Sequence, residues 1–354
     1  MIEIYKGKKV FITGNTGFKG SWLTAVFKKL NIEVEGYALE PETTPSHFNL
    51  LPGYCNTTFA NILDRDKLDA AIAMAKPDIV FHLAAQALVR TSYTDPVNTY
   101  QTNVMGTLNV LQAAGNCDSV RAIVLITTDK VYDNKECKKA YLETDELGGY
   151  DMYSSSKACC EILIRSYRNS FFNIADYKIK HQVLIASARA GNVIGGGDWS
   201  IDRLVPDIAR ATATRSKVNI RNPTSVRPWQ HVLDCLYGYI LLGARLLNGE
   251  REFAEAWNFS PYSNEAKNVE EIAAIAKKSW DDVEIEFGTV PHNFHEAGLL
   301  ILDNSKAIKK LQWKPVWNTT QAVQKTIEWY KAYYTDRNIL TDENIIGYLK
   351  NIHP

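Results

Sequence analysis

The sequence lacks both a long uninterrupted hydrophobic run and an excess of charge of either sign. Its 40 basic and 40 acidic side chains cancel over 354 residues, so no overall field would draw the chain to nucleic acid or to an anionic membrane. The most apolar long stretch, residues 232–247, is interrupted by Asp234 and Arg245 and is shorter than the roughly 20 residues that a bilayer requires. We expect a buried helix there, and neither a nucleic-acid nor a membrane partner.

Cysteine is also scarce and scattered. No two cysteines form a C-x-x-C pair, and none has the spacing of a metal ligand with the seven histidines. The apolar core of a signal peptide is missing after Met1. These absences predict reduced thiols, no metal site and a cytoplasmic protein. The six cysteines are Cys55, Cys117, Cys137, Cys159, Cys160 and Cys235.

Short hydrophobic runs alternate with helix-length amphipathic segments through the first half of the chain. This alternation predicts parallel β-α-β units whose strands are covered on both faces. The order is typical of an α/β fold with a Rossmann-type doubly wound parallel sheet, which binds ligands beyond the carboxyl ends of its strands. The expected strands are 9–13, 34–39, 57–60, 79–84, 122–127 and 183–188, and the expected helices are 20–30, 64–75, 96–114 and 155–171.

This rhythm changes after about residue 191, where a glycine-rich loop, shorter helices and short strands follow. We expect residues 191–230 and 261–354 to form a smaller C-terminal α/β lobe that binds the substrate. Residues 1–190, joined by the apolar segment 231–260, are expected to form the nucleotide-binding domain.

The first expected strand runs into a G-x-x-G-x-x-G turn, from Gly14 to Gly20, that opens a helix. Glycines let backbone N–H groups approach a pyrophosphate, and a helix amino terminus favours its negative charge. A plain structural turn could carry the same glycines, but the position directly after the first strand favours a dinucleotide site. Beyond the second strand, Glu40 and Glu42 would repel a 2′-phosphate. This favours NAD over NADP, although two solvated loop acids would look the same.

Tyr153 and Lys157 stand four residues apart and therefore share one face of an expected helix. The lysine, together with the positive charge of a nicotinamide, is expected to lower the pKa of the phenol from its usual value of about 10. The phenolate could then accept a hydroxyl proton as hydride leaves carbon. An isolated pair of this kind is more often ordinary helix surface, but this pair follows the fifth expected strand and a glycine-rich turn.

The fifth expected strand is followed by Thr128, Asp129 and Lys130, which places a hydroxyl, a carboxyl and an amine at the carboxyl end of a central strand. A dehydrogenase needs only the hydroxyl, and a solvated turn would explain the other two residues. An acid and a base beside a redox centre would, however, permit elimination of water next to a newly formed ketone.

Several segments carry a family resemblance: residues 14–22, 82–87, 102–104, 128–132 and 153–157. Together they resemble the extended short-chain dehydrogenases that act on nucleotide sugars, the NAD-dependent epimerase/dehydratase family. The loops 189–199 and 227–232 resemble the sugar-nucleotide loops of its CDP-glucose 4,6-dehydratases, enzymes whose usual setting is deoxysugar synthesis for the cell surface. Related dehydratases for dTDP-glucose or GDP-mannose carry an acidic pair in place of Asp129 and Lys130, and epimerases generally lack the pair.

The resemblance implies a set of residues that bind NAD. They are Gly14, Thr16, Gly17, Phe18, Lys19, Gly20, Asn61, Ile62, Leu83, Ala84, Ala85, Asn103, Tyr153 and Lys157. One position departs from the family, which usually has Asp in place of Asn61, facing the adenine. An amide can still accept a hydrogen bond from the adenine amine through its carbonyl oxygen.

The resemblance also implies how the substrate and a second copy are bound. A nucleotide diphosphate needs cationic or amide donors. The implied substrate-binding residues are Gln86, Asn192, Arg203, Arg227 and His231. By the same analogy we expect a homodimer or homotetramer, with the helices 96–114 and 155–171 packed across a two-fold axis.

A mechanism follows from the same resemblance. Tyr153, steered by Thr128 and Lys157, would remove the O4 proton of CDP-glucose while the C4 hydride passes to NAD. We expect Lys130 to take the C5 proton and Asp129 to protonate the departing C6 hydroxyl, although the sequence leaves these two roles open. Return of hydride to C6 would give a 4-keto-6-deoxy sugar. The alternatives are an epimerase, a dehydratase of another nucleotide sugar, a net reductase and an NAD-sensing regulatory protein.

Overall fold

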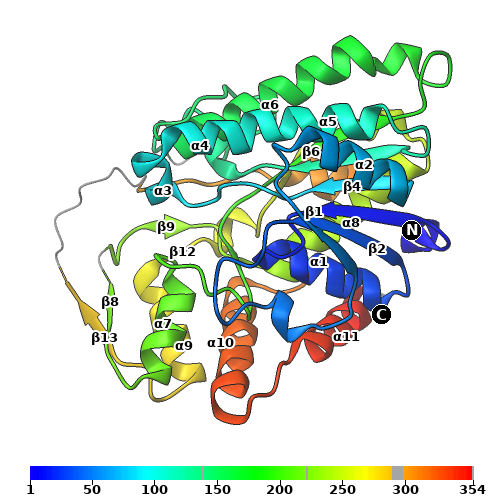
Figure 1. Ribbon diagram of the computed structural model, residues 1–354. Coiled ribbons are helices and arrows are strands. Elements are labelled where there is room, and N and C mark those ends of the chain that lie inside the picture. The colour runs from blue at the N-terminus through cyan, green and yellow to red at the C-terminus, as the bar shows by residue number, and fades with distance from the viewer. Residues whose placement is uncertain (138, 221, 289–297, 353–354) are drawn as a thin grey trace.

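A computed structural model describes residues 1–137, 139–220, 222–288 and 298–352 (Figure 1). Its centre is a seven-stranded sheet in the order β11-β6-β5-β4-β1-β2-β3, with every neighbouring pair parallel. The strands are β1 (Lys9–Thr13), β2 (Glu33–Ala38), β3 (Asn56–Phe59), β4 (Ile79–His82), β5 (Ala122–Ile126), β6 (Leu184–Ala190) and β11 (Ala256–Phe259). The sequence-based expectation of a Rossmann-type doubly wound fold is confirmed.

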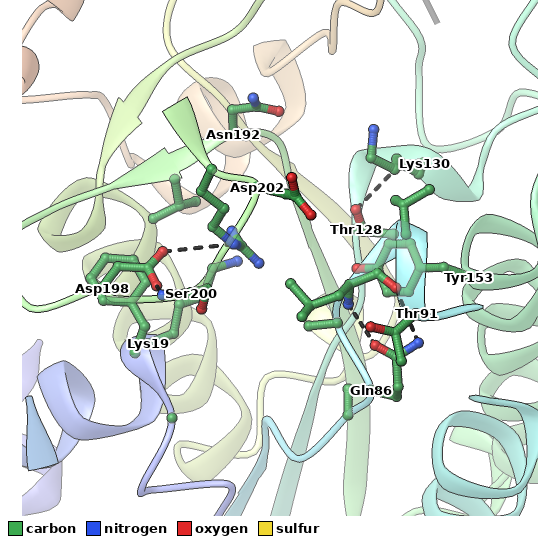
Figure 2. A pocket seen from close by; sticks show the side chains of 18 of the residues that line it. Lys19, Gln86, Thr91, Thr128, Lys130, Tyr153, Asn192, Asp198, Ser200 and Asp202 are labelled. Atoms are coloured by element: carbon green, nitrogen blue, oxygen red, sulfur yellow. Dashed lines mark hydrogen bonds and ion pairs between the residues drawn. The ribbon is translucent and has the colours of Figure 1, made fainter. Parts of the chain in front are cut away.

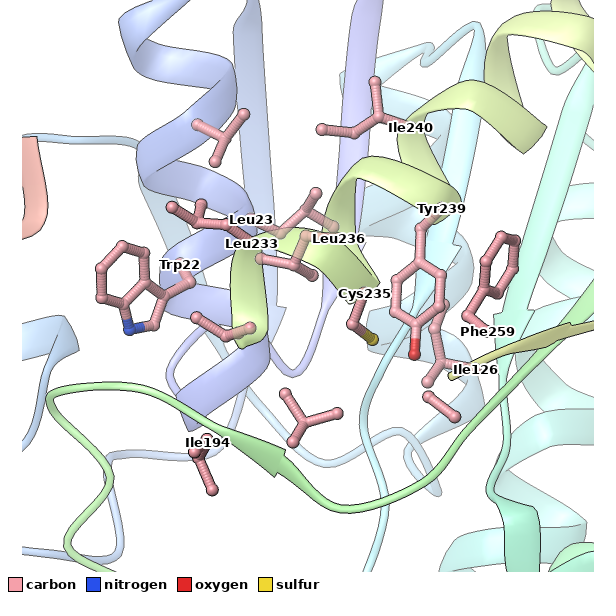
Figure 3. Packing of buried hydrophobic residues seen from close by; sticks show 14 of the residues in the cluster. Trp22, Leu23, Ile126, Ile194, Leu233, Cys235, Leu236, Tyr239, Ile240 and Phe259 are labelled. Carbon is pink, nitrogen blue, oxygen red and sulfur yellow. The ribbon is translucent and has the colours of Figure 1, made fainter. Parts of the chain in front are cut away.

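Helices cover both faces of this sheet. On one face lie α1 (Phe18–Lys29), α8 (Val232–Leu247) and α11 (Thr341–Ile352), and on the other lie α2 (Arg65–Ala75), α5 (Gly106–Gly115) and α6 (Met152–Phe171). Strand side chains alternate between the two cores, because Val10 and Ile12 of β1 pack on the α1 side and Phe11 packs on the α2 side. Figure 3 shows Leu236 of α8 beside Leu23 of α1. No helix in the described ranges is long and apolar enough to cross a membrane.

The expected helix 96–114 is interrupted. It consists of α4 (Pro96–Tyr100), a π-helical turn at Gln101–Met105, and α5. The fully buried Asn103 lies in this turn, where its side chain bonds both backbone polar groups of Gln86. Single π turns inside helices often occur at functional sites. The hydrophobic period alone did not reveal this one, because the extra residue is stabilised by a contact with a distant loop.

The C-terminal half adds a second layer of helices and short strands (Figure 1). The helices are α7 (Leu204–Ala213), α9 (Val269–Ser279) and α10 (Thr319–Asp336), and α3 (Val89–Thr94) faces them from the first half. The two-stranded pairs are β7 (Val193–Ile194) with β10 (Gln230–His231), β8 (Val218–Ile220) with β13 (Ile285–Phe287), and β9 (Val226–Arg227) with β12 (Lys267–Asn268). One hydrophobic core runs from the sheet into this layer through side chains such as Ile272 and Trp329.

The last helix, α11, departs from the expected division, which placed residues 261–354 together in the second lobe. It packs on α1 and α8, which cover one face of the central sheet. Lys29 forms an ion pair of 2.8 Å with Asp342, and the Tyr348 hydroxyl donates a hydrogen bond of 2.7 Å to Asp234. The apolar face of α11 thus completes the core beside α1, a long-range contact that local sequence does not show.

The buried Asp234 carboxyl is expected to link stability to pH. Burial raises its pKa to about 7, against hydrogen bonds from the Val316 N–H and the Tyr348 hydroxyl. The unfolded chain releases this proton near pH ~4. The contribution of the protonated carboxyl to the free energy of unfolding is therefore full below that pH and is lost as the pH rises towards 7. Asp234→Asn keeps an accepting oxygen and should remove a few kcal/mol of this pH dependence. Urea unfolding of both proteins across this range measures it, and equal slopes would contradict the expectation.

Candidate active site

A cavity of about 1230 Å³ opens between the carboxyl ends of the central strands and the second layer. Its wall contains residues that follow β1, β4, β5 and β6, together with the whole segment 198–207. The strand order reverses between β1 and β4, and such switch points are where doubly wound sheets bind ligands. Pockets that bind one drug-sized ligand measure roughly 300–1,000 Å³. This cavity is larger, so it has room for more than a single drug-sized ligand.

The glycine-rich turn forms one end of this cavity, which all six expected residues line: Gly14, Thr16, Gly17, Phe18, Lys19 and Gly20. Gly14 has a φ of +75°, and a Cβ there would lie 2.6 Å from the Ala84 nitrogen. A Cβ on Gly20 would lie 2.1 Å from the Gly14 carbonyl oxygen. Helix α1 begins here with Gly17 as its N-cap and without a side-chain cap, so its first N–H groups are available to an anion. The turn fits a pyrophosphate.

Replacing Gly20 by alanine is expected to weaken NAD binding by about 10- to 100-fold. The added Cβ must displace the Gly14 carbonyl, and overpacking of this kind costs about 1–3 kcal/mol. Gly347→Ala in α11 is a matched control, because no atom lies within 4 Å of its added Cβ. Calorimetric titration with NAD measures both variants. Unchanged affinity in Gly20→Ala would exclude a pyrophosphate site at this turn.

The next wall of the cavity holds Asn61, Ile62, Leu83, Ala84 and Ala85. The side-chain oxygen of Asn61 accepts a 2.9 Å hydrogen bond from the Leu63 N–H. An amide oxygen has two lone pairs, so one remains for a ligand donor. Glu40 and Glu42 border the same cavity, in a position to oppose a further phosphate.

Two expected ligand-binding residues lie outside the cavity wall, Asn103 and His231. Asn103 holds the Gln86 backbone and the Ser156 hydroxyl, so any effect on a cofactor is indirect. His231 is fully buried at the start of α8, where its Nδ1 accepts from the Leu233 N–H at 3.2 Å. Burial lowers the pKa of His231 to about 3. In the structure its side chain caps α8 and packs in the core, and its expected contact with a substrate stays a prediction.

The Tyr153 hydroxyl and its neighbours meet at the carboxyl end of β5 (Figure 2). Asp151 caps α6 by accepting a 2.9 Å hydrogen bond from the Ser154 N–H, which places Tyr153 and Lys157 in the first turns of the helix. Both side chains line the cavity although they are almost fully buried. Thr128 lies beside Tyr153 in the same view. The structure therefore brings together the three residues expected to handle a hydroxyl proton.

Burial raises the pKa of Tyr153 to about 12, against the opposing effects of the Thr128 hydroxyl and the Arg203 charge. The expected lowering of this pKa by Lys157 together with the charge of a nicotinamide stays a prediction. Lys157 donates a hydrogen bond to the Ile126 carbonyl at 3.3 Å, and burial lowers the pKa of the lysine itself. The groups of the chain thus keep the phenol protonated at neutral pH.

Asp129 and Lys130 line the same cavity one step beyond Thr128. Thr128 donates a 3.0 Å hydrogen bond to Asp129 Oδ1, while Oδ2 is buried and makes no hydrogen bond to any described residue. No ion pair joins Asp129 to Lys130 within the described part of the chain. In the described structure both residues therefore line one cavity without forming an ion pair with each other.

The expected substrate-binding residues differ in how far their polar groups already bind other residues of the protein. Asn192 lines the cavity opposite Thr128 (Figure 2), and Arg203 also lines it, 3.7 Å from Asp198. Arg227 lines it too, while donating to the carbonyl of Gly298 at 3.1 Å. Gln86 is a cavity residue whose amide is engaged by Leu88 and Thr99, so it shapes its own loop.

Sequence reasoning missed an ion pair that joins the two sides of the cavity. Arg90 of α3 and Asp202 of the second layer approach to 2.6 Å, and both line the cavity. Their positions are 112 residues apart, and neither belongs to a recognisable motif. No group of three or more His, Cys, Asp or Glu residues in the described ranges is placed to hold a metal ion.

Comparison with known sequences agrees with this geometry. A family model described as GDP-mannose 4,6 dehydratase matches residues 11–326. The CDP-glucose 4,6-dehydratase of Salmonella typhimurium is 46% identical over 340 residues, which cover 96% of this chain and 94% of that protein. The UDP-glucose 4-epimerase of Mycoplasma pneumoniae is 22% identical, covering 92% of this chain and 97% of that protein.

Solved structures share the fold. The dTDP-glucose 4,6-dehydratase of Bacillus anthracis, solved in complex with NAD, gives a TM-score of 0.76 at 18% identity and covers 93% of this chain and 98% of its own. The UDP-glucose 4-epimerase of Thermotoga maritima, solved with UDP-glucose, gives a TM-score of 0.77 at 19% identity and covers 91% and 98%. Given the family match over most of its length, the chain belongs to the GDP-mannose 4,6 dehydratase family.

Proposed function

We propose that the protein is a hydro-lyase that converts CDP-D-glucose to CDP-4-keto-6-deoxy-D-glucose with bound NAD. The observation that carries this proposal is the placement of Asp129 and Lys130 in one cavity with Tyr153. An epimerase needs only the tyrosine centre, because it removes no water. The 46% identity to a CDP-glucose 4,6-dehydratase supports the choice of CDP-glucose.

The first step is oxidation at C4. Tyr153 accepts the proton of the O4 hydroxyl, which Thr128 orients. Lys157, held at the end of β5 by the Ile126 carbonyl, supplies positive charge beside the phenol. Bound NAD would accept the C4 hydride and later return it to C6, and its oxidised ring would add the positive charge that lowers the pKa of the phenol. The glycine cradle at Gly14 would hold the pyrophosphate of the cofactor, and the acids at Glu40 and Glu42 favour NAD over NADP.

The second step is loss of water across C5 and C6. The new C4 ketone acidifies the C5–H bond, and we assign removal of this proton to Lys130. Asp129, which lines the same cavity, donates a proton to the C6 hydroxyl, which departs as water. The resulting double bond is reduced at C6 by the returning hydride and takes up a proton at C5, so the product is a 4-keto-6-deoxy sugar.

The nucleotide half of the substrate is assigned to the opposite wall of the cavity. Asn192, Arg203 and Arg227 supply amide and guanidinium donors for its diphosphate. We propose that residues 191–230, together with the elements from residue 261 to the end of α10, form the lobe that binds the substrate.

Assembly is part of the same proposal. Val97, Met105 and Ile162 are exposed apolar side chains on α4, the π turn and α6. Helices α4 and α6 pack together, so this surface could bury itself against a second copy across a two-fold axis. We propose a homodimer or homotetramer. The six unpaired cysteines support a cytoplasmic setting.

The proposal is tested by incubating the purified protein, with NAD in catalytic amount, with CDP-glucose, dTDP-glucose, UDP-glucose and GDP-mannose separately. The expected result is loss of one water from CDP-glucose without net NADH, identified by mass and NMR. An unchanged mass with inverted C4 would establish an epimerase instead. No reaction with any donor would favour a regulatory protein.

A further inference from the structure

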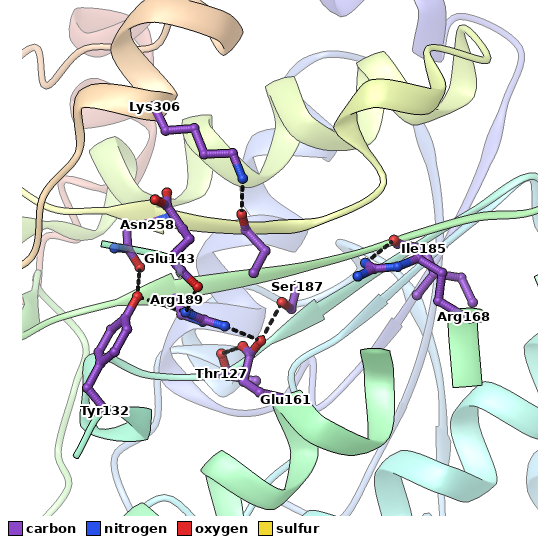
Figure 4. Close-up of polar contacts among 11 residues, drawn as sticks. Thr127, Tyr132, Glu143, Glu161, Arg168, Ile185, Ser187, Arg189, Asn258 and Lys306 are labelled. Carbon is purple, nitrogen blue, oxygen red and sulfur yellow. Dashed lines mark hydrogen bonds and ion pairs between the residues drawn. The ribbon is translucent and has the colours of Figure 1, made fainter. Parts of the chain in front are cut away.

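Thr127 and Tyr132 flank the segment 128–130, and both form a hydrogen bond with one buried ion pair (Figure 4). Arg189 of β6 and Glu161 of α6 approach to 2.8 Å, and each side chain is no more than 4% exposed. The Thr127 hydroxyl, just before the segment, donates to Glu161 Oε1. Arg189 Nη1 donates a 2.8 Å hydrogen bond to the hydroxyl of Tyr132, two residues after Lys130.

The ion pair has further partners that keep it in place. Ser187 donates to Glu161 Oε2 at 2.8 Å, and the Tyr132 hydroxyl donates to Asn258 Oδ1 at 2.7 Å. Burial raises the pKa of Glu161, but the Arg189 charge and these hydrogen bonds outweigh it, so the pKa is lowered overall. A buried ion pair with this many partners has little freedom to move.

The two halves of the proposed reaction depend on this network differently. Tyr153 and Lys157 are part of α6, whose backbone holds them directly. Asp129 and Lys130 lie instead in a short 3-10 turn between β5 and Tyr132, outside any longer helix or strand. Their position therefore depends on how the turn contacts the rest of the protein. Val131 packs in a hydrophobic cluster with Ala158 of α6, and the two ends are held through Thr127 and Tyr132.

We propose that Arg189 and Glu161 are positioning residues for the elimination of water. They act through Thr127 and Tyr132 to hold residues 128–130 against the C5–C6 bond of the sugar. The inference rests on the proposed function. A displacement of about 1 Å can cost roughly 100-fold in rate, so release of the Tyr132 end should slow water loss about 10- to 100-fold. Oxidation at C4 should change little, because α6 holds Tyr153 and Lys157, and Thr128 lies at the other end of the segment.

Three isosteric variants separate the two ends of the segment. Tyr132→Phe removes the hydroxyl at the far end and should accumulate NADH and the 4-keto sugar. Thr127→Val loosens the end beside Thr128 and should slow both half-reactions. Thr326→Val is the matched control, because it removes a buried hydroxyl of α10 that donates to the Ala322 carbonyl, away from the segment, and should slow neither. Single turnovers with CDP-glucose, followed by NADH absorbance and by the mass of quenched product, resolve the two steps.

Arg189→Lys is a second test of whether Arg189 positions the segment through Tyr132. It keeps a positive charge beside Glu161 but cannot bridge to the Tyr132 hydroxyl as a guanidinium does, so it should reproduce the Tyr132→Phe pattern. Equal slowing of both half-reactions in Tyr132→Phe and Arg189→Lys, or slowing of neither, would overturn the inference while leaving the proposed function intact. A wild-type protein that does not dehydrate CDP-glucose would overturn both.

Discussion

Lys130→Met is expected to yield a protein that reduces its NAD once with CDP-glucose and releases no water. Methionine keeps an apolar stem of similar length but cannot accept a proton. Tyr153, Lys157 and Thr128 remain, so the C4 hydride is still transferred. Loss of a general base costs about 10²–10⁴-fold. A single turnover should therefore show a stable NADH signal and a sugar that has lost no water. The wild type should show only a transient NADH signal.

The matched control for this prediction is Lys135→Met. Lys135 lies five residues further on, is 65% exposed and pairs with Asp133. It does not line the cavity, so its replacement should leave both half-reactions at the wild-type rate. Full turnover by Lys130→Met would remove the lysine as the base, and the C5 proton would then have to pass to another group such as Asp129.

Tyr153→Phe should stop the reaction one step earlier than Lys130→Met. Without the phenol no group accepts the O4 proton, so C4 oxidation is expected to slow by about 10²–10⁴-fold and NADH should not form. CDP-glucose should still bind, because the ring stays in place. Tyr262→Phe, at a tyrosine that does not line the cavity, is the control. NADH formation in Tyr153→Phe at the wild-type rate would show that another residue is the base.

The pH dependence of the wild type follows from the same tyrosine. Only the phenolate accepts a proton, and burial raises the pKa of Tyr153 to about 12. The positive charge of bound NAD would lower this pKa. Below the lowered value the phenolate fraction still increases with pH, so the rate of C4 oxidation should increase by up to tenfold for each pH unit and then level off. Stopped-flow NADH formation between about pH 6 and 8 measures this slope. A rate that falls as the pH rises would contradict the assignment.

The central strands could be predicted because burial on both faces leaves a simple pattern. All five residues of β5 are buried, so an uninterrupted hydrophobic run marks the strand. The π turn at Asn103 and the docking of α11 were not predictable in the same way. The first depends on a loop at Gln86, and the second on Asp234, more than 100 residues earlier. Local periodicity contains no information about either partner.

The same distinction applies to the site. The glycine turn, the Tyr153 helix and residues 128–130 are each a contiguous motif, and the structure gathers them in one cavity. The ion pairs at Arg90 and Arg189 join residues 112 and 28 positions apart, so only the fold reveals them. His231 shows the opposite case. It lies in a loop that resembles the family motif, but its side chain is buried and caps α8.

The most direct test of the account follows deuterium placed at C4 of CDP-glucose, in ordinary water. The deuterium is expected at C6 of the CDP-4-keto-6-deoxyglucose product, with a solvent proton at C5 and no net NADH. That result requires one hydride to leave C4 and return to C6 within the same active site. Deuterium recovered at C4 of an epimerised sugar, or lost to solvent from a dehydrated product, would contradict it.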